Sequence, residues 1–291
     1  MSTVSKPTWV DPERWPYPVQ AHVDSDGAMA FVDVGPRDGP VVLMAHGTPT
    51  WSIEWAAVID GLKDTARCIA IDHLGFGLSE RPDVGYAPED HAQRFARFAD
   101  HLDLHDVTLV VHDFGGPIAL PWAVANPDRV RRIVIVNTFG WPLDDEPHIA
   151  RPARMLGSGF GRWLYGAFNL SIEFVASTAW KDRAHWRALV DQIRPVFPDP
   201  KSRKQVLWAL AKSLLASTDH YAALEQGLRQ LEPRPAFSVV WGTDDPAFPV
   251  SFRDRWLALL PGAERVDVSA GHWPHVEEPS AVVEHLRRVL A

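Results

Sequence analysis

The chain has 291 residues, of which 46% are apolar and 23% are charged, and its formal net charge is −8. This composition is that of an ordinary globular protein, so it excludes a disordered or collagen-like chain, and the length suits one large domain or a core with an inserted module. The negative charge also argues against nucleic acid as a partner, because phosphate contacts require a basic surface.

The N-terminal segment, MSTVSKPTWVDPERWPYP, has no apolar core of the kind that a signal peptide carries. No later stretch approaches the roughly 20 consecutive apolar residues of a membrane span. With a single cysteine, Cys68, no intramolecular disulfide can form. We therefore expect a soluble, cytoplasmic protein that has no membrane partner.

Short apolar runs alternate with helical patterns through the first half of the chain. An antiparallel meander at about 18–34 is followed by strands at 41–44, 68–71, 107–111 and 133–136, with amphipathic helices at about 51–62, 88–103 and 115–126 between them. The strand segments are rich in β-branched residues and almost entirely apolar, as strands buried on both faces are. This order predicts a parallel sheet with right-handed crossovers.

The pattern changes after residue 138. From about 140 to 225 the chain shows helical patterns interrupted by prolines and no convincing strand, and strands resume at 237–241 and 264–268, with helices near 250–260 and 277–290. We expect an α/β core made of residues 1–138 and 228–291, with an all-helical insert at 139–227.

One segment that follows a predicted strand, His112–Gly116, has the form of a nucleophile elbow. Its two glycines suit a strained turn with closely packed backbone. The nucleophile position holds Asp113, and a carboxylate can displace a leaving group from an sp3 carbon to form an alkyl ester. The backbone N–H groups of Thr48 and Phe114 are the expected oxyanion donors.

An ester on Asp113 must be hydrolysed by water, which requires a base. His272 is the candidate base and Asp245 the acid that orients it, in the chain order nucleophile, acid, base. The Gly-His pair after a strand favours His272 over His275, and the Gly-x-x-Asp spacing favours Asp245 over Asp244.

Five segments occur in the order of the motifs of a known enzyme family. They are His46–Trp51, Asp72–Ser79 with Arg81 and Pro82, His112–Gly116, the Gly-x-x-Asp that ends at Asp245, and Gly271–His272 followed by Glu277–Pro279. In these segments the chain resembles the α/β-hydrolase fold and, within it, the haloalkane dehalogenases. The resemblance implies a mostly parallel central sheet flanked by helices, with the insert as a helical cap over the active site. It implies no cofactor and no metal. We expect a small apolar halogenated or epoxide substrate, and a monomer or small homo-oligomer.

The halide-binding positions depart from the family pattern. The family has a Trp directly after the nucleophile and often an Asn at the position of Thr48, whereas this chain has Phe114 and Thr48. Phenylalanine offers no N–H. Dehalogenation then requires donors from the cap, such as Trp141, Trp163 or Tyr165, or a better leaving group such as bromide or iodide.

Three alternative functions remain open. Epoxide hydrolases share the fold and the aspartate nucleophile, and they protonate the opening epoxide with two cap tyrosines, for which Tyr165 and Tyr221 are the candidates. A third relative opens β-lactones with loss of carbon dioxide. A non-catalytic ligand receptor is the least favoured, because all three triad positions are filled.

Overall fold

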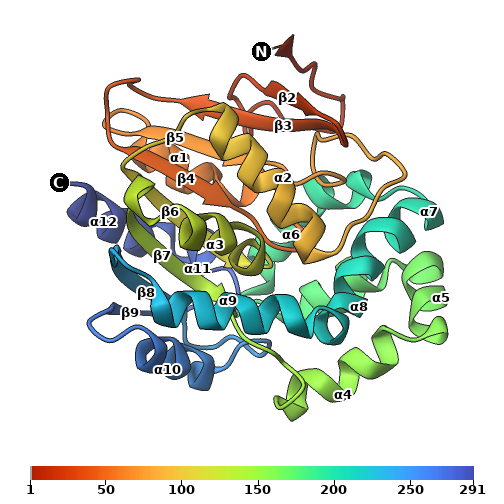
Figure 1. Cartoon of the computed structure of the whole chain (residues 1–291). Coiled ribbons are helices and arrows are strands. Elements are labelled where there is room, and N and C mark those ends of the chain that lie inside the picture. Colours follow the sequence, from red (N-terminus) through yellow and green to blue (C-terminus); the bar gives the residue numbers. More distant parts are fainter. Residues whose placement is uncertain (1) are drawn as a thin grey trace.

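The computed structural model describes residues 2–291, and its centre is a nine-stranded sheet (Figure 1). The strand order is β1-β2-β3-β5-β4-β6-β7-β8-β9. The first three pairs in this order are antiparallel, and every pair from β5–β4 onward is parallel. The strands are β1 (Ser2–Thr3), β2 (Gln20–Asp24), β3 (Gly27–Val34), β4 (Val41–Ala45), β5 (Arg67–Ile71), β6 (Val107–Asp113), β7 (Val130–Thr138), β8 (Ala236–Gly242) and β9 (Glu264–Val268). The mostly parallel sheet predicted from the alternating pattern is confirmed, as is the antiparallel edge.

Helices cover both faces of the sheet, which explains why the central parts of the inner strands are mostly apolar on both faces. On the face toward the viewer in Figure 1, α2 (Pro88–His101) packs on α3 (Gly115–Ala125), and α3 packs on α9 (Thr218–Gln230). On the other face, α1 (Ala56–Leu62) and α11 (Pro274–Glu277) pack on α12 (Pro279–Leu290). Every residue of β6 is buried between these layers.

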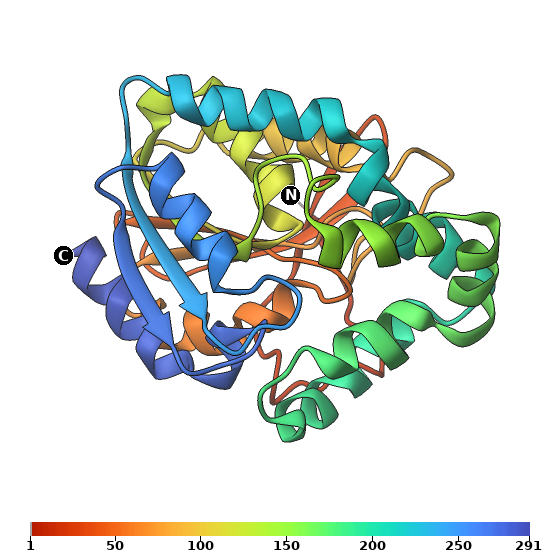
Figure 2. The same ribbon diagram turned by 90° about the horizontal axis from the view of Figure 1, so that it is seen from below.

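Between β7 and β8 the chain is helical, and no strand occurs there among the described residues. The α-helices before α9 are α4 (Pro147–Leu156), α5 (Gly159–Phe168), α6 (Arg183–Ile193), α7 (Pro200–Ser202) and α8 (Trp208–Ala216), joined by short 3-10 and π-helical segments. Figure 2 shows them grouped beside the core. We propose that α4 to α8 form the cap, because α9 returns to pack on α3 of the core. Within residues 2–291, no helix is both long and apolar enough to cross a membrane.

Candidate active site

Asp113 lies at a sharp turn between the end of β6 and the start of α3. Its φ of 47° is in the left-handed region, which non-glycine residues rarely adopt. The backbone around the turn is tightly packed, because a side chain at Gly115 would overlap the carbonyl of Ala45 and one at Gly47 would overlap Asp113 itself. Such strain persists only where the surroundings enforce it, and it is typical of functional sites.

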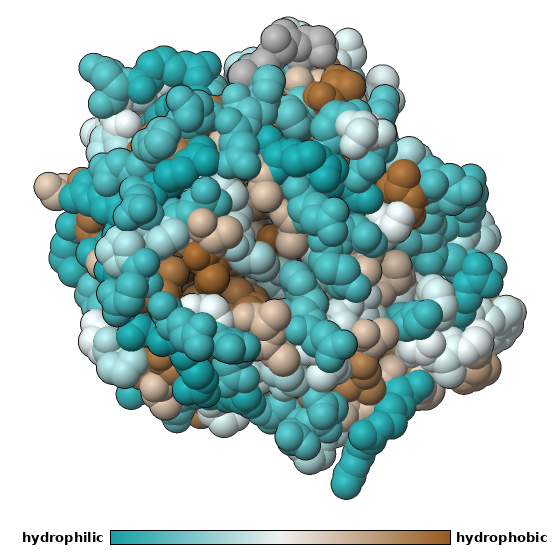
Figure 3. Space-filling model, viewed as in Figure 1, coloured by the Kyte–Doolittle hydropathy of each residue, from teal (hydrophilic) through white to brown (hydrophobic). Residues whose placement is uncertain are grey.

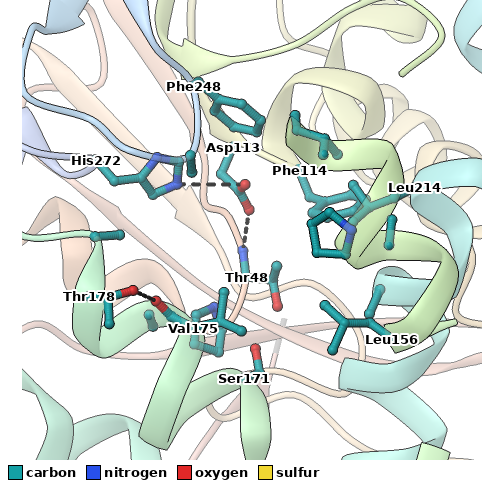
Figure 4. Close-up of a pocket in the computed structure, with 18 of the residues that line it drawn as sticks. Thr48, Asp113, Phe114, Leu156, Ser171, Val175, Thr178, Leu214, Phe248 and His272 are labelled. Atoms are coloured by element: carbon teal, nitrogen blue, oxygen red, sulfur yellow. Dashed lines mark hydrogen bonds and ion pairs between the residues drawn. The ribbon is translucent and has the colours of Figure 1, made fainter. Parts of the chain in front are cut away.

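The two carboxylate oxygens of Asp113 have different surroundings (Figure 4). The backbone N–H of Thr48 donates to Oδ1 over 2.8 Å, and Oδ2 lies 3.6 Å from Nε2 of His272. Phe114 begins the first turn of α3, where backbone N–H groups have no partner within the helix and the helix dipole favours negative charge. Oδ1 is therefore bound by a donor, while Oδ2 is available for attack on a substrate.

His272 lies between two carboxylates. Its Nδ1 is 2.7 Å from Oδ2 of Asp245, and Nε2 faces Asp113. Burial alone would lower the pKa of His272, but the charges of Asp245 and Asp113 and their hydrogen bonds outweigh it and raise the pKa to about 10. The imidazole is therefore protonated at neutral pH while Asp113 is charged, and it can accept a proton only after that charge is lost.

Asn137, which sequence reasoning did not single out, holds Asp245 in place. Its side-chain amide donates to Oδ2 of Asp245 over 2.7 Å and accepts from the backbone N–H of Gly242 over 2.8 Å. The N–H of Ala247 donates to the other oxygen, Oδ1, over 2.7 Å. The signal in the sequence was a polar residue directly after the apolar run Ile133–Val136, and the structure buries it.

Glu277 ties the loop that carries His272 to the helical insert. Its carboxylate accepts from the N–H groups of Gly271 over 2.8 Å, Lys181 over 2.9 Å and Asp182 over 3.0 Å. The N–H of His272 in turn donates to the carbonyl of Ala179 over 2.8 Å. The sequence marked Glu277 as part of a motif but suggested no role for it.

A buried polar cluster made of Glu54, His112 and His275 lies beside this loop. Glu54 Oε1 is 3.0 Å from Nδ1 of His112 and 3.5 Å from Nε2 of His275, while Nε2 of His112 is 2.9 Å from the carbonyl oxygen of His272. Burial would raise the pKa of Glu54, but the two histidines hold it well below its usual range. His275, the alternative candidate for the base, thus belongs to this cluster and faces Glu54. Among the described residues, these three side chains are also the group whose ligand atoms lie close enough together to hold a metal ion. However, Nδ1 of His112 and Oε1 of Glu54 already share a hydrogen bond.

A cavity of about 320 Å³ lies in front of Asp113, between the core and the insert (Figure 4). That volume suits a small ligand. Apart from Asp113 and His272, its lining is mainly apolar, with the hydroxyls of Thr48, Tyr165, Ser171 and Thr178 and the ring of His148 as further polar groups. The apolar lining includes Pro49, Phe114, Ile149, Leu156, Val175, Leu207, Leu214, Phe248 and Trp273.

Of the six residues expected to contact substrate or halide, Thr48, Phe114 and Tyr165 line this cavity. The hydroxyl of Thr48 is buried and has no hydrogen-bond partner among the described residues. Burial raises the pKa of Tyr165 despite its hydrogen bond with Ser171, so its phenol stays neutral. Trp273 also lines the cavity, and its place directly after His272 was the signal that sequence reasoning did not use.

The other three candidates, Trp141, Trp163 and Tyr221, do not line this cavity. Trp141 is buried against Phe252 and Trp256. Trp163 lies on the outer surface of α5 and is 54% exposed. Tyr221 is buried in α9 and donates its hydroxyl to the carbonyl of Ser213 over 3.0 Å. A count of aromatic residues in a segment does not reveal which way each side chain points.

Known proteins are similar to this chain in sequence and in fold. A model of the alpha/beta hydrolase fold matches residues 40–279. Over 278 residues the chain is 33% identical to haloalkane dehalogenase 2 of Mycobacterium tuberculosis, covering 94% of each chain. It is 32% identical over 282 residues to a cis-3-alkyl-4-alkyloxetan-2-one decarboxylase of Xanthomonas campestris, covering 90% of this chain and 92% of the relative.

Among solved structures, a haloalkane dehalogenase described as ancestral superposes with a TM-score of 0.83 at 27% identity, covering 93% of this chain and 98% of the other. The haloalkane dehalogenase DatA of Agrobacterium tumefaciens superposes with a TM-score of 0.80 at 25% identity, covering 94% and 95%.

Proposed function

The chain belongs to the haloalkane dehalogenase-like branch of the α/β-hydrolase family, and on that premise we propose that it hydrolyses small apolar haloalkanes through an alkyl ester on Asp113. The observation that carries the proposal is the unequal placing of the Asp113 oxygens. Oδ1 is bound by a backbone N–H, while Oδ2 faces His272 at a mainly apolar cavity.

The first step is displacement of the halide. Oδ2 of Asp113 attacks the sp3 carbon in line, the new C–O bond forms, and the C–halogen bond breaks with its electron pair leaving on the halide. Oδ1 stays on the Thr48 N–H. The apolar lining excludes water that would otherwise solvate and weaken the carboxylate nucleophile.

The second step is hydrolysis of the ester. Esterification removes the negative charge of Asp113, so the pKa of His272 falls and the imidazolium releases its Nε2 proton to solvent. The neutral Nε2 can then take a proton from the attacking water. The water oxygen attacks the carboxyl carbon, and the developing charge on Oδ1 is stabilised by the N–H groups of Thr48 and Phe114. Asp245 stabilises the imidazolium until the bond from the carboxyl carbon to Oδ2 breaks. The departing oxygen takes the proton held on Nε2 and leaves in the alcohol, and the new carboxyl group of Asp113 releases its own proton to solvent.

The donor groups of the cavity favour the better leaving groups. Trp141 and Trp163 do not line the cavity, and Phe114 has no N–H on its side chain. The candidate donors to a departing halide are the unpartnered indole N–H of Trp273, the hydroxyls of Thr48 and Tyr165, and backbone N–H groups. We therefore expect bromoalkanes and iodoalkanes to react much faster than chloroalkanes of the same length.

A β-lactone is the second candidate substrate, because opening it requires no halide site. The supporting observations are that the side chain of Phe114, beside the nucleophile in the cavity lining, offers no N–H to a halide, and the similarity to the oxetanone decarboxylase of Xanthomonas campestris. Epoxide hydrolysis by two tyrosines has less support, since Tyr165 lines the cavity but Tyr221 does not.

A single turnover in heavy-oxygen water tests the proposal. With enzyme in excess over 1-bromohexane, the first alcohol should carry ordinary oxygen from Asp113, and the peptide that holds Asp113 should gain heavy oxygen. Heavy oxygen in the first alcohol would mean direct attack by water and would refute the ester mechanism. Carbon dioxide release from a β-lactone, without bromide release from any bromoalkane, would assign the site to the second candidate. Asp113→Ala serves as the inactive control.

A further inference from the structure

The segment from α4 to α8 differs in charge from the rest of the chain. Residues 147–216 contain 11 Lys and Arg but 4 Asp and Glu, a net charge of +7, whereas the whole chain carries −8. Four of these cations, Arg151, Arg154, Arg162 and Lys212, are exposed and form no ion pair with any residue of the described range 2–291. A cationic face on an acidic protein attracts anionic partners.

The same segment exposes a group of large apolar side chains, a feature typical of interaction surfaces. Six of them lie between residues 155 and 175, namely Met155, Phe160, Trp163, Phe168, Phe174 and Val175, each about half exposed. On α5, Phe160 stacks on Trp163 with ring centroids 5.9 Å apart, and Trp163 meets Phe168 edge-on at 5.5 Å. Figure 3 shows pale and brown side chains at the right-hand edge of the molecule, where α5 lies in Figure 1. We call Phe160, Trp163 and Phe168 the α5 aromatic surface.

A cationic depression adjoins the α5 aromatic surface. Arg162, which precedes Trp163, lines it together with Lys201, Lys204, Gln205 and Asp83, around a volume of about 420 Å³. None of the three cations forms an ion pair with another described residue, and the Asp83 carboxylate is 3.2 Å from the amide of Gln205. The depression therefore offers three positive charges to an anionic group.

The cavity that holds Asp113 reaches the same side of the molecule. Val175 lines that cavity and is also 48% exposed. Leu156 lines the cavity too, and it directly follows the exposed Met155. A molecule that reaches this apolar surface is therefore already beside the catalytic pocket.

We propose that this face docks on the surface of an anionic phospholipid bilayer. The α5 aromatic surface enters the boundary between headgroups and acyl chains, and Arg162, Lys201 and Lys204 bind headgroup phosphates. A second copy fits the surface less well, because the Arg162, Lys201 and Lys204 side chains of two such faces would repel one another. Docking of this kind needs no membrane-spanning helix, and it delivers apolar substrates dissolved in the bilayer to the pocket.

Co-sedimentation with vesicles tests the charge requirement. The protein should bind vesicles of phosphatidylglycerol mixed with phosphatidylcholine, bind pure phosphatidylcholine much less, and lose binding as salt is raised. Arg162→Glu and Lys204→Glu should each weaken binding at least about fivefold, since each cation near such a surface contributes about 1 kcal/mol. Arg131→Glu, on β7 of the core, should have no effect. Equal binding to both vesicle types, or no binding to either, would overturn the proposal.

The aromatic requirement is tested separately. The double variant Phe160→Ser/Phe168→Ser should reduce binding to the anionic vesicles at least about tenfold, because two apolar rings no longer leave water. It should release bromide from a water-dissolved bromoalkane at the unchanged rate, because neither ring lines the cavity. Val23→Ser removes an exposed apolar side chain of the core and is the matched control. Sedimentation velocity that shows a dimer broken by the double variant would instead assign the surface to a second copy and overturn the proposal.

Discussion

Replacing Asp245 by Asn should separate the two chemical steps. Three donors point at the Asp245 carboxylate, namely His272 Nδ1 and the Asn137 amide at Oδ2 and the Ala247 N–H at Oδ1. An Asn side chain has one acceptor oxygen and an NH2 group that can only donate. In the variant, either one N–H donor faces the new NH2 group without an acceptor between them, or Nδ1 of His272 accepts from that NH2 group. In the second case the hydrogen of the neutral imidazole lies on Nε2, and in that tautomer Nε2 cannot accept a proton from water.

The size of the effect follows from the lost charge. A carboxylate about 4 Å from the centre of the imidazolium stabilises it by about 4 kcal/mol at the effective dielectric constant of such sites. The imidazolium forms during ester hydrolysis, so that step should slow by about a thousandfold. Attack by Asp113 moves no proton, and we expect its rate to change by less than about tenfold. The alkyl ester should then accumulate to one per enzyme.

Rapid-quench mass measurement with 1-bromohexane checks this expectation by following bromide and the mass of the enzyme together. The predicted result for Asp245→Asn is a stoichiometric burst of bromide and a persistent alkyl adduct. Asp244→Asn is the matched control, because Asp244 is half exposed and pairs with Lys181 rather than with His272. Equal slowing in the two variants, or slow bromide release in Asp245→Asn with no adduct, would refute the role given to Asp245.

The other predictions concern the loop, the halide and pH. Glu277→Gln should slow ester hydrolysis about tenfold and lower Tm, because one of the three backbone hydrogen bonds to this side chain must be lost. Stopped-flow kinetics measures the rate and calorimetry measures Tm. Phe114→Trp should raise chloride release relative to bromide release by supplying an indole N–H, and an unchanged ratio would count against a missing donor. Because the pKa of His272 is raised from 6.5 to about 10, its contribution to stability is complete below pH 6.5 and is lost as pH rises through about 10. Urea unfolding at a series of pH values should show this loss, and Asp113→Ala, whose His272 pKa is less raised, should lose less over the same range.

The sheet could be predicted from sequence because its signals are local. A buried parallel strand must be apolar on both faces, so runs such as Val107–Val111 and Ile133–Val136 are visible without knowledge of their partners. Asp113 and His272 were visible for a related reason, since each lies at a turn directly after a strand. The structure brings both to the same cavity although 158 residues separate them.

The contacts of the cap could not be predicted in this way. Trp141 and Trp163 lie in the same helical insert, yet one is buried against α10 (Val250–Leu259) and the other is exposed to solvent. Nothing near either residue in the sequence distinguishes these outcomes, because each depends on how helices distant in sequence pack together. Glu277 is a similar case, since two of its three donors belong to a segment about 95 residues away.

The measurement that tests the central claim most directly is the intact mass of His272→Phe after exposure to 1-bromohexane. Without its base, the enzyme should keep the ester that Asp113 forms. The account predicts a mass increase equal to one hexyl group without bromine, located by proteolysis on the peptide that holds Asp113, and one bromide released per enzyme. Continued bromide release with no adduct, or an adduct on any other residue, would contradict it.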